Sequence, residues 1–331
     1  MNLQTTYLGM KLKNPLVPSA SPLSQDLDMA RRLEDAGASA LVMYSLFEEE
    51  ILAEEEDLEQ MMGFQDIGHG EADTYLPLHH DYKTGLEEYL DQLAALKRAL
   101  DIPVIASLNG ISAGGWVEHA VELEQAGADA LELNLYLVPS MEQTPDDIER
   151  RYVDILQHLK SSIKLPIAVK LSPYFSSLGN LVQRLEHAGA DGVALFNRFY
   201  QPDLDLDTLE INPVLQLSEP YEALLRMHWI ARLCGRVHLS LAATGGIHGV
   251  EQVSKMLLAG ANVTHLCSVL LQQGPGVITS ILAELRQWME EKEYDSVAQL
   301  TGSVCQVHAP DPVAYDRANY LKVLKHYSSR T

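Results

Sequence analysis

Three polar side chains interrupt apolar segments that are long enough to be buried strands. Asn134 lies in ALELNLYLVPS, Lys170 in PIAVKLSPYF and Asn197 at the end of HAGADGVALFN. An ammonium group in a buried strand costs several kcal/mol unless an anion or a polar ligand compensates it. The compensating group could be a carboxylate such as Glu132 or a bound ligand, and we favour the ligand. Amides donate and accept hydrogen bonds, so the two Asn side chains suit the edge of a planar heterocycle.

Two loops near the end of the chain could bind an anion. ATGGIHG (243–249) and HLCS (265–268) each follow an apolar strand and precede a helical pattern. Backbone N–H groups at such loops and helix starts bind phosphate, and in an α/β barrel the loops after the last two strands commonly do so. The predicted phosphate-binding residues are Thr244, Gly245, Gly246, Cys267 and Ser268.

Further polar or small residues follow other predicted strands, where a barrel places its chemistry. We expect ligand contacts from Ser19, Ala20, Ser21 and Ser107. Proton transfer would need a group that can donate or accept a proton. The candidates for that role are Tyr44, Tyr136, His79 and His80.

A repeated joint between a helix and a strand organises these residues. DAGASALVMYS, QAGADALELNL, HAGADGVALFN and LAGANVTHLCS each place a glycine after a helical pattern and then an apolar strand. Glycine suits this position because it adopts positive φ without a Cβ clash. The recurrence predicts alternating helices and strands.

Eight apolar strands follow from this alternation. They are continuously hydrophobic, as parallel strands covered on both faces are. We expect them at about 16–21, 40–45, 104–109, 130–136, 167–172, 192–197, 239–246 and 265–270. Eight strand and helix pairs favour a closed (β/α)8 TIM barrel of the α/β class over an open doubly wound sheet.

Two segments exceed a minimal barrel. Residues 46–83 form an acidic excursion after the second strand, and residues 291–331 form a C-terminal extension that we expect to be helical. Long connections on a barrel are often lids or binding loops. No linker divides the chain, so we expect one domain over 1–331, with the barrel at about 1–290.

Composition narrows the class of protein. The 331-residue chain has 46 Asp and Glu against 24 Lys and Arg, a formal net charge of −22 that disfavours nucleic acid and anionic membranes as partners. It has no secretion signal and no apolar run of 18 residues, so we expect a cytoplasmic protein. Its three cysteines lie far apart, and we predict no metal site.

Several motifs together resemble the dihydroorotate dehydrogenase family over most of residues 1–295. They are NPLVPSAS, PVIASLNG, GADALELNL, PIAVKLSPYF, FNRFYQPDLDL, LSEPYEALLRM and ATGGIHGVEQVSKMLLAGA. The resemblance implies an FMN-containing barrel, a small-molecule substrate, a role in pyrimidine biosynthesis and a homodimer. FMN would have its phosphate at Gly245, Gly246, Cys267 and Ser268. Its ring would lie over Ser19 to Ser21 and meet Asn134, Lys170 and Asn197, with Lys170 near the edge where reduced flavin gathers negative charge.

The chain departs from the family where the family handles its substrate. The position of the family's Cys or Ser base is Leu137, and that of a substrate-binding Asn is Pro139. The family's Lys in the second strand corresponds to Met43, and the glycine pair that adds phosphate contacts corresponds to Leu215 and Gln216. A leucine cannot accept a proton. The segment HGEADTYLPLHHDY also replaces the family's substrate loop.

Three hypotheses follow. The first, which we favour, is an FMN-dependent oxidoreductase acting on a substrate other than dihydroorotate, with hydride transfer at flavin N5 and with Lys170, Tyr136 and Tyr44 as the catalytic candidates. The second is a true dihydroorotate dehydrogenase with an atypical base. The third is a flavin- or phosphate-binding protein without turnover.

Overall fold

Eight parallel strands form the centre of the protein. The computed structural model describes residues 1–51, 53–54, 84–110, 116–198, 201–212, 214–315 and 318–328. The strands are β3 (Leu16–Pro18), β4 (Leu41–Phe47), β5 (Val104–Gly110), β6 (Ala130–Leu135), β7 (Ile167–Leu171), β8 (Gly192–Leu195), β11 (Ser240–Thr244) and β12 (Val263–Leu266). From β4 to β12 each strand pairs with the next in this order, and β12 returns to pair with β3.

The sheet closes into a barrel between β3 and β4. The Ser39 N–H and hydroxyl groups, just before β4, both donate to the Leu16 carbonyl at 3.0 and 2.8 Å. The predicted TIM barrel is therefore confirmed and the open sheet is excluded. The eighth strand differs from its predicted bounds of 265–270, because a helix already begins at Ser268.

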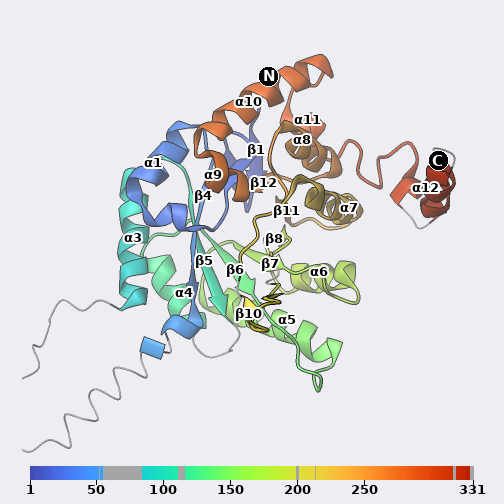
Figure 1. Cartoon of the computed structure of the whole chain (residues 1–331). Coiled ribbons are helices and arrows are strands. Elements are labelled where there is room, and N and C mark those ends of the chain that lie inside the picture. Colours follow the sequence, from blue (N-terminus) through green and yellow to red (C-terminus); the bar gives the residue numbers. More distant parts are fainter. Residues whose placement is uncertain are drawn as a thin grey trace, which may run out of the picture.

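Helices cover the outside of the barrel (Figure 1). They are α1 (Leu27–Asp35), α3 (Gly85–Ala99), α4 (Trp116–Gln125), α5 (Pro145–Ser162), α6 (Leu178–His187), α7 (Ala223–Leu233), α8 (Val250–Ala259), α9 (Ser268–Gln273) and α10 (Gly276–Glu291). The repeated glycine joint has a direct physical cause. Gly37, Gly127, Gly189 and Gly260 all have φ between 96° and 117°, where a side chain would be strained.

The barrel interior changes from apolar to polar along the strands. At its lower level it holds small or β-branched side chains, including Ala130, Ala168 and Val263, and is filled by Tyr7 from the hairpin of β1 (Thr5–Tyr7) and β2 (Met10–Leu12). Two residues further along, side chains point to the same face. That next level contains the buried polar residues Ser107, Glu132, Lys170 and His265.

A bulge in β4 changes how the barrel wall is held at Ser107. The pairing of β4 with β5 shifts register between Val42 and Ser45. The hydroxyl of buried Tyr89, on α3, accepts the Ser107 N–H at 2.9 Å and donates to its carbonyl at 3.3 Å. The Ser45 and Ser107 hydroxyls also lie 2.9 Å apart. The Tyr89 hydroxyl thus makes hydrogen bonds to the Ser107 backbone at the point where the pairing of β4 with β5 is irregular.

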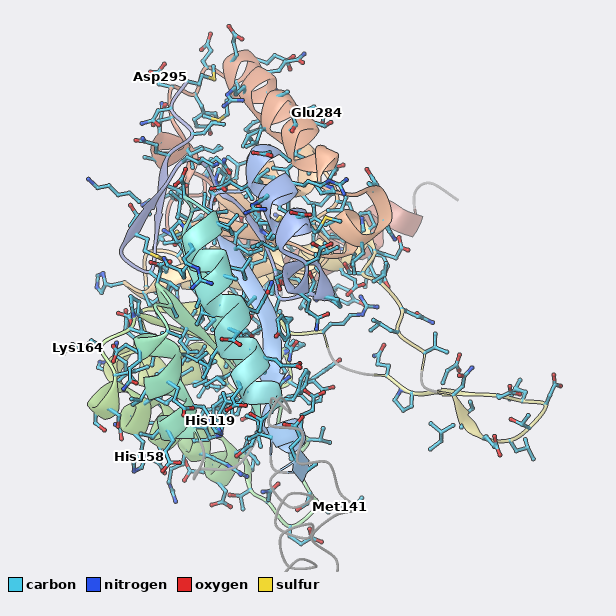
Figure 2. All side chains as sticks on the ribbon, turned by 90° about the vertical axis from the view of Figure 1, so that its left-hand side faces the viewer. His119, Met141, His158, Lys164, Glu284 and Asp295 are labelled. Carbon is cyan, nitrogen blue, oxygen red and sulfur yellow. The ribbon has the colours of Figure 1, made fainter. Side chains whose placement is uncertain are left out.

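Two elements extend beyond the barrel. The hairpin of β9 (Asp203–Leu204) and β10 (Ile211–Asn212) stands clear of it (Figure 2) and exposes Leu204, Leu206, Leu209 and Ile211. After α10 come α11 (Val297–Leu300) and α12 (Ala318–Ser328), of which α12 lies apart from the barrel in Figure 1. Among the described helices, none combines the length and apolarity that a bilayer crossing requires.

Removal of the Tyr89 hydroxyl tests the role of the bulge. Tyr89→Phe leaves the buried Ser107 N–H without its acceptor, so the free energy of unfolding should fall by about 1–3 kcal/mol. Denaturant unfolding measures the change, and Tyr320→Phe, at a residue that is 63% exposed, is the control. Equal stabilities for the two variants would show that the hydroxyl contributes nothing.

Candidate active site

A large cavity opens at the carboxyl ends of the barrel strands. It has a volume of about 700 Å³, within the usual range for small-molecule sites. Its lining is rich in amides and hydroxyls. The residues that carry the argument are Asn109, Asn134, Tyr136, Lys170, Asn197 and Arg198.

A smaller cavity of about 250 Å³ adjoins the first one. Five residues line both: Ala20, Lys170, Asn197, Arg198 and Leu215. The other lining residues of the small cavity include many of the predicted ligand contacts. They are Ser19, Ser21, Thr244, Gly245, Gly246, Cys267 and Ser268. The fold thus gathers residues from β3, β8, β11 and β12 around one continuous space.

Lys170 lies where the two cavities meet. Its Nζ atom donates to Glu132 Oε1 at 3.0 Å, and both side chains are buried. The carboxylate partner that the sequence left open is therefore present. Lys170 nevertheless lines both cavities, and its ammonium has three donors of which Glu132 accepts one in the described structure. The amine can serve the ion pair and a ligand together.

His265 shares the carboxylate of Glu132 with Lys170. Its Nδ1 atom lies 3.7 Å from Glu132 Oε2, and its ring packs edge-on against Tyr7. Neither ring nitrogen has a hydrogen-bond partner among the described residues, although the side chain is fully buried. Burial lowers the pKa of His265 to about 4, so the ring is neutral at pH 7. His265 also lines the small cavity, where a ligand could satisfy it.

Asn134 and Asn197 act as a pair. Asn197 Nδ2 donates to Asn134 Oδ1 at 2.8 Å across the end of β7. Each amide keeps further donor or acceptor capacity. Because Lys170 lies on the strand between them, the three side chains form one polar edge at the floor of the large cavity.

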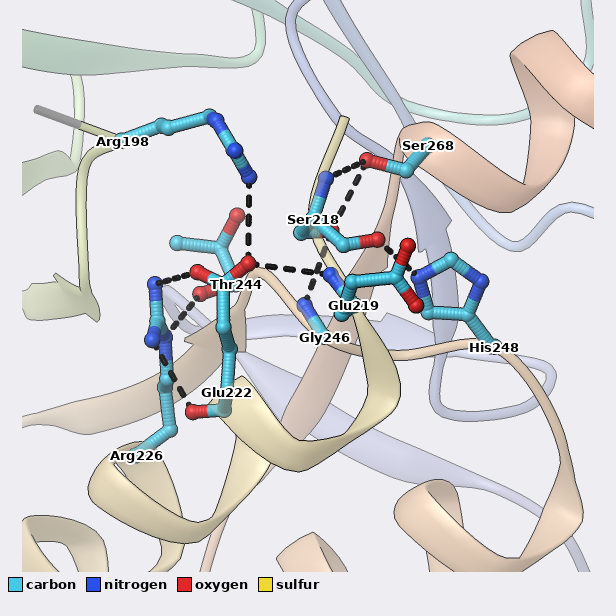
Figure 3. A network of polar contacts seen from close by, with 9 residues as sticks. All are labelled: Arg198, Ser218, Glu219, Glu222, Arg226, Thr244, Gly246, His248 and Ser268. Atoms are coloured by element: carbon cyan, nitrogen blue, oxygen red, sulfur yellow. Dashed lines mark hydrogen bonds and ion pairs between the residues drawn. The ribbon is translucent and has the colours of Figure 1, made fainter. Parts of the chain in front are cut away.

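Ser218 ties the two predicted phosphate loops together (Figure 3). Its Oγ atom accepts the Gly246 N–H at 3.1 Å and lies 2.8 Å from Ser268 Oγ. Gly245 and Gly246 have φ of 91° and 77°. A Cβ atom at Gly246 would lie 2.5 Å from the Ala223 nitrogen, so only glycine fits this turn.

Two arginines flank the same loops. Arg226 is buried, and its Nε atom donates to the Thr244 carbonyl at 3.0 Å. Arg198 Nη1 donates to Glu222 Oε1 at 3.2 Å, and Arg226 Nη2 lies 3.6 Å from Glu222 Oε2 (Figure 3). The loops are held by side chains from η2 (Pro220–Glu222) and α7, which is a second layer of support around the small cavity.

Comparison with known proteins identifies the family. The family model described as dihydroorotate dehydrogenase matches residues 2–289. The chain belongs to the dihydroorotate dehydrogenase family. The predicted resemblance is confirmed, and family membership supports an oxidoreductase.

Relatives from archaea and bacteria extend the match to nearly full length. The catalytic subunit of dihydroorotate dehydrogenase B (NAD(+)) from Thermoplasma volcanium is 24% identical over 91% of this chain and 98% of the relative. The subunit with the same description from Pyrococcus abyssi is 25% identical over 92% of this chain and 100% of the relative. That from Shouchella clausii is 25% identical, with coverages of 91% and 97%.

The positions where the chain departs from the dihydroorotate dehydrogenase pattern lie in different places, and only two of the five line the large cavity. Leu137 and Pro139 line a separate, mostly apolar cavity of about 450 Å³ between the segment after β6 and the segment after β7. Met43 is fully buried in the hydrophobic core. Leu215 and Gln216, by contrast, line the large cavity. Leu137 and Pro139 are therefore absent from the described lining of the large cavity.

Two predicted site residues, Tyr44 and Ser107, line neither of the two adjoining cavities. The Tyr44 ring packs against Tyr89, 4.8 Å between centroids, and Tyr44 lines neither of the two adjoining cavities. Ser107 is buried beneath the large cavity, bonded to Ser45 and Tyr89. Tyr136 does line the large cavity. His79 and His80 lie outside the described residues.

Four contributors to the site were not predicted: Ser218, Glu222, Arg226 and His265. Ser218 and Glu222 belong to an irregular segment and a short 3-10 helix, for which apolar periodicity gives no signal. His265 did carry a signal, because an imidazole in the buried strand VTHL needs compensation as Lys170 does.

The arrangement fits the FMN that the family implies. A planar heterocycle rich in carbonyl and nitrogen groups could use three features of the site. They are the donors of Lys170 that Glu132 leaves free, the His265 ring nitrogens and the Asn134–Asn197 pair. The small cavity leads from these groups to the Gly245–Gly246 turn and the start of α9 at Ser268. These residues could hold a ring at one end and a phosphate at the other.

The buried imidazole makes stability depend on pH. The pKa of His265 is about 4 in the folded protein and 6.5 as its ordinary value, so the unfolded chain binds the proton first as pH falls. Full stability is present above about pH 6.5, and about 3 kcal/mol is lost between there and about pH 4. Between pH 8 and pH 5 the wild type should lose about 2 kcal/mol more than His265→Gln in denaturant unfolding. Equal losses would contradict a buried neutral imidazole.

Proposed function

We propose that this protein is an FMN-dependent oxidoreductase that acts on a small substrate other than dihydroorotate. The observation that carries the proposal is the pair of adjoining cavities that share Lys170 and Asn197. The small cavity, with its glycine turn, would hold the phosphate end of FMN. The substrate would lie in the large cavity beside Asn134 and Tyr136. When bound, FMN would supply the hydride chemistry at N5.

The chain's own residues have distinct parts in this proposal. Lys170 would place positive charge beside the flavin, where charge develops on reduction, while Glu132 orients the ammonium through their 3.0 Å contact. Asn134 and Asn197 would orient the ring edge. Among the described candidates for proton transfer, Tyr136 lines the large cavity and Tyr44 does not.

The substrate proposal rests on what the large cavity lacks. Its described lining contains neither Leu137 nor Met43, the positions that correspond to the family's base and second-strand Lys. Loss of a positioned base alone lowers a rate by about 100-fold to 10,000-fold. Dihydroorotate would therefore be a poor substrate. Homodimerisation stays a prediction from the family resemblance, and light scattering can test it.

The visible spectrum of the purified protein tests cofactor binding. We expect a yellow protein with one FMN per chain, and FMN binding about 10-fold or more weaker in Lys170→Met, because charge-assisted contacts are lost. Lys255→Met, at a surface residue of α8, is the matched control. A colourless protein that takes up no FMN would end the proposal.

Turnover assays separate the alternatives. Orotate formation from dihydroorotate with an added acceptor dye, above the rate of free FMN, would identify a true dihydroorotate dehydrogenase. Tight FMN binding without flavin reduction by any donor would instead favour a binding protein. The proposal expects reduction by a different small donor.

A further inference from the structure

Arg198 is a cation that the cofactor proposal does not use. It follows Asn197 after β8 and lines both cavities, with 37% of its side chain exposed. Among the described residues, the two other Lys or Arg side chains that line these cavities are each held by neighbouring groups. Lys170 pairs with Glu132, and Arg226 bonds to the carbonyls of Thr244 and Glu222.

Glu222 is shared between two guanidinium groups. Its carboxylate lies 3.2 Å from Arg198 Nη1 and 3.6 Å from Arg226 Nη2, and it also accepts the Glu219 N–H at 2.9 Å (Figure 3). One carboxylate cannot neutralise two cations. Glu222 would keep Arg226 and the Glu219 N–H as partners if Arg198 turned towards a ligand.

The acidic side chains at the large cavity do not remove this excess charge. Glu49 and Asp203 line it but are exposed, so water and salt screen them from Arg198. Within the described part of the chain Arg198 forms one ion pair, through Nη1, and a guanidinium fork can bind a carboxylate with two parallel hydrogen bonds.

We propose that Arg198 binds a carboxylate of the substrate, and that Glu222 holds the guanidinium in position until the ligand arrives. The proposal rests on the proposed function, since it assigns a substrate-binding residue of the same site. Asn109 lines the same cavity and would bind a carbonyl or amide of that molecule.

Calorimetric titration of the FMN-loaded protein with matched probe pairs tests the assignment. The pairs are orotate and uracil, benzoate and benzamide, and fumarate and fumaramide, each of which compares a carboxylate with a neutral counterpart. In at least one pair the wild type should bind the carboxylate about 10-fold to 100-fold more tightly. Arg198→Gln should abolish that preference, and Arg198→Lys should keep only part of it.

Two further variants separate recognition from net charge. Arg150→Gln removes one positive charge from exposed α5 and should keep the wild-type preference. Glu222→Gln removes the competing carboxylate and should strengthen carboxylate binding. No preference in any pair, or the same preference in Arg198→Gln, would overturn the assignment. Failure to load FMN would count against the proposed function instead, and calorimetry on the chain as purified would still measure the preference.

Discussion

The ion pair between Lys170 and Glu132 is the constraint around which the rest of the site is arranged. Removing two charges from water costs more than their attraction returns unless geometry and hydrogen bonds are favourable. The barrel meets this only in part, with a 3.0 Å contact between Lys170 Nζ and Glu132 Oε1 and an apolar level beneath, while Glu132 Oε2 has no hydrogen-bond partner among the described residues. A buried pair of this kind contributes little to stability. Its position at the meeting point of two cavities gives it a functional explanation.

The degree of charge compensation differs between the two cations that line both cavities. Lys170 is neutralised inside the barrel, whereas Arg198 at the rim of the same space shares its carboxylate with Arg226. Of these two cations, Arg198 is therefore the less compensated among the described residues, which suits an anionic molecule beside it. Ser218 and the Gly245–Gly246 turn shape the adjoining cavity without adding charge.

The barrel could be predicted because the glycine joint and the apolar strand are short patterns that recur along the sequence. Each pattern determines the structure of its own segment. Lys170, Asn134 and Asn197 were predictable for the same reason, since a polar side chain in a buried strand demands a partner. Tyr44 and Ser107 line neither cavity, because the β4 bulge redirects the wall and brings Tyr89 from α3 onto Ser107. The network of Ser218, Glu222 and Arg226 depends on the tertiary packing of an irregular segment. Such a segment has no apolar periodicity from which these contacts could be predicted. Leu137 and Pro139 were recognised as departures, but only the structure shows that they line another cavity.

A double-mutant cycle on the ion pair tests the central claim most directly. Free energies of unfolding would be measured at pH 7 for Lys170→Met, Glu132→Leu and the double variant. The account predicts that each single variant loses about 3–5 kcal/mol, since it leaves an unpaired buried charge, and that the double variant recovers most or all of this loss. A double variant as unstable as the sum of the two single losses would contradict it, because the two side chains would then contribute independently and not as an ion pair.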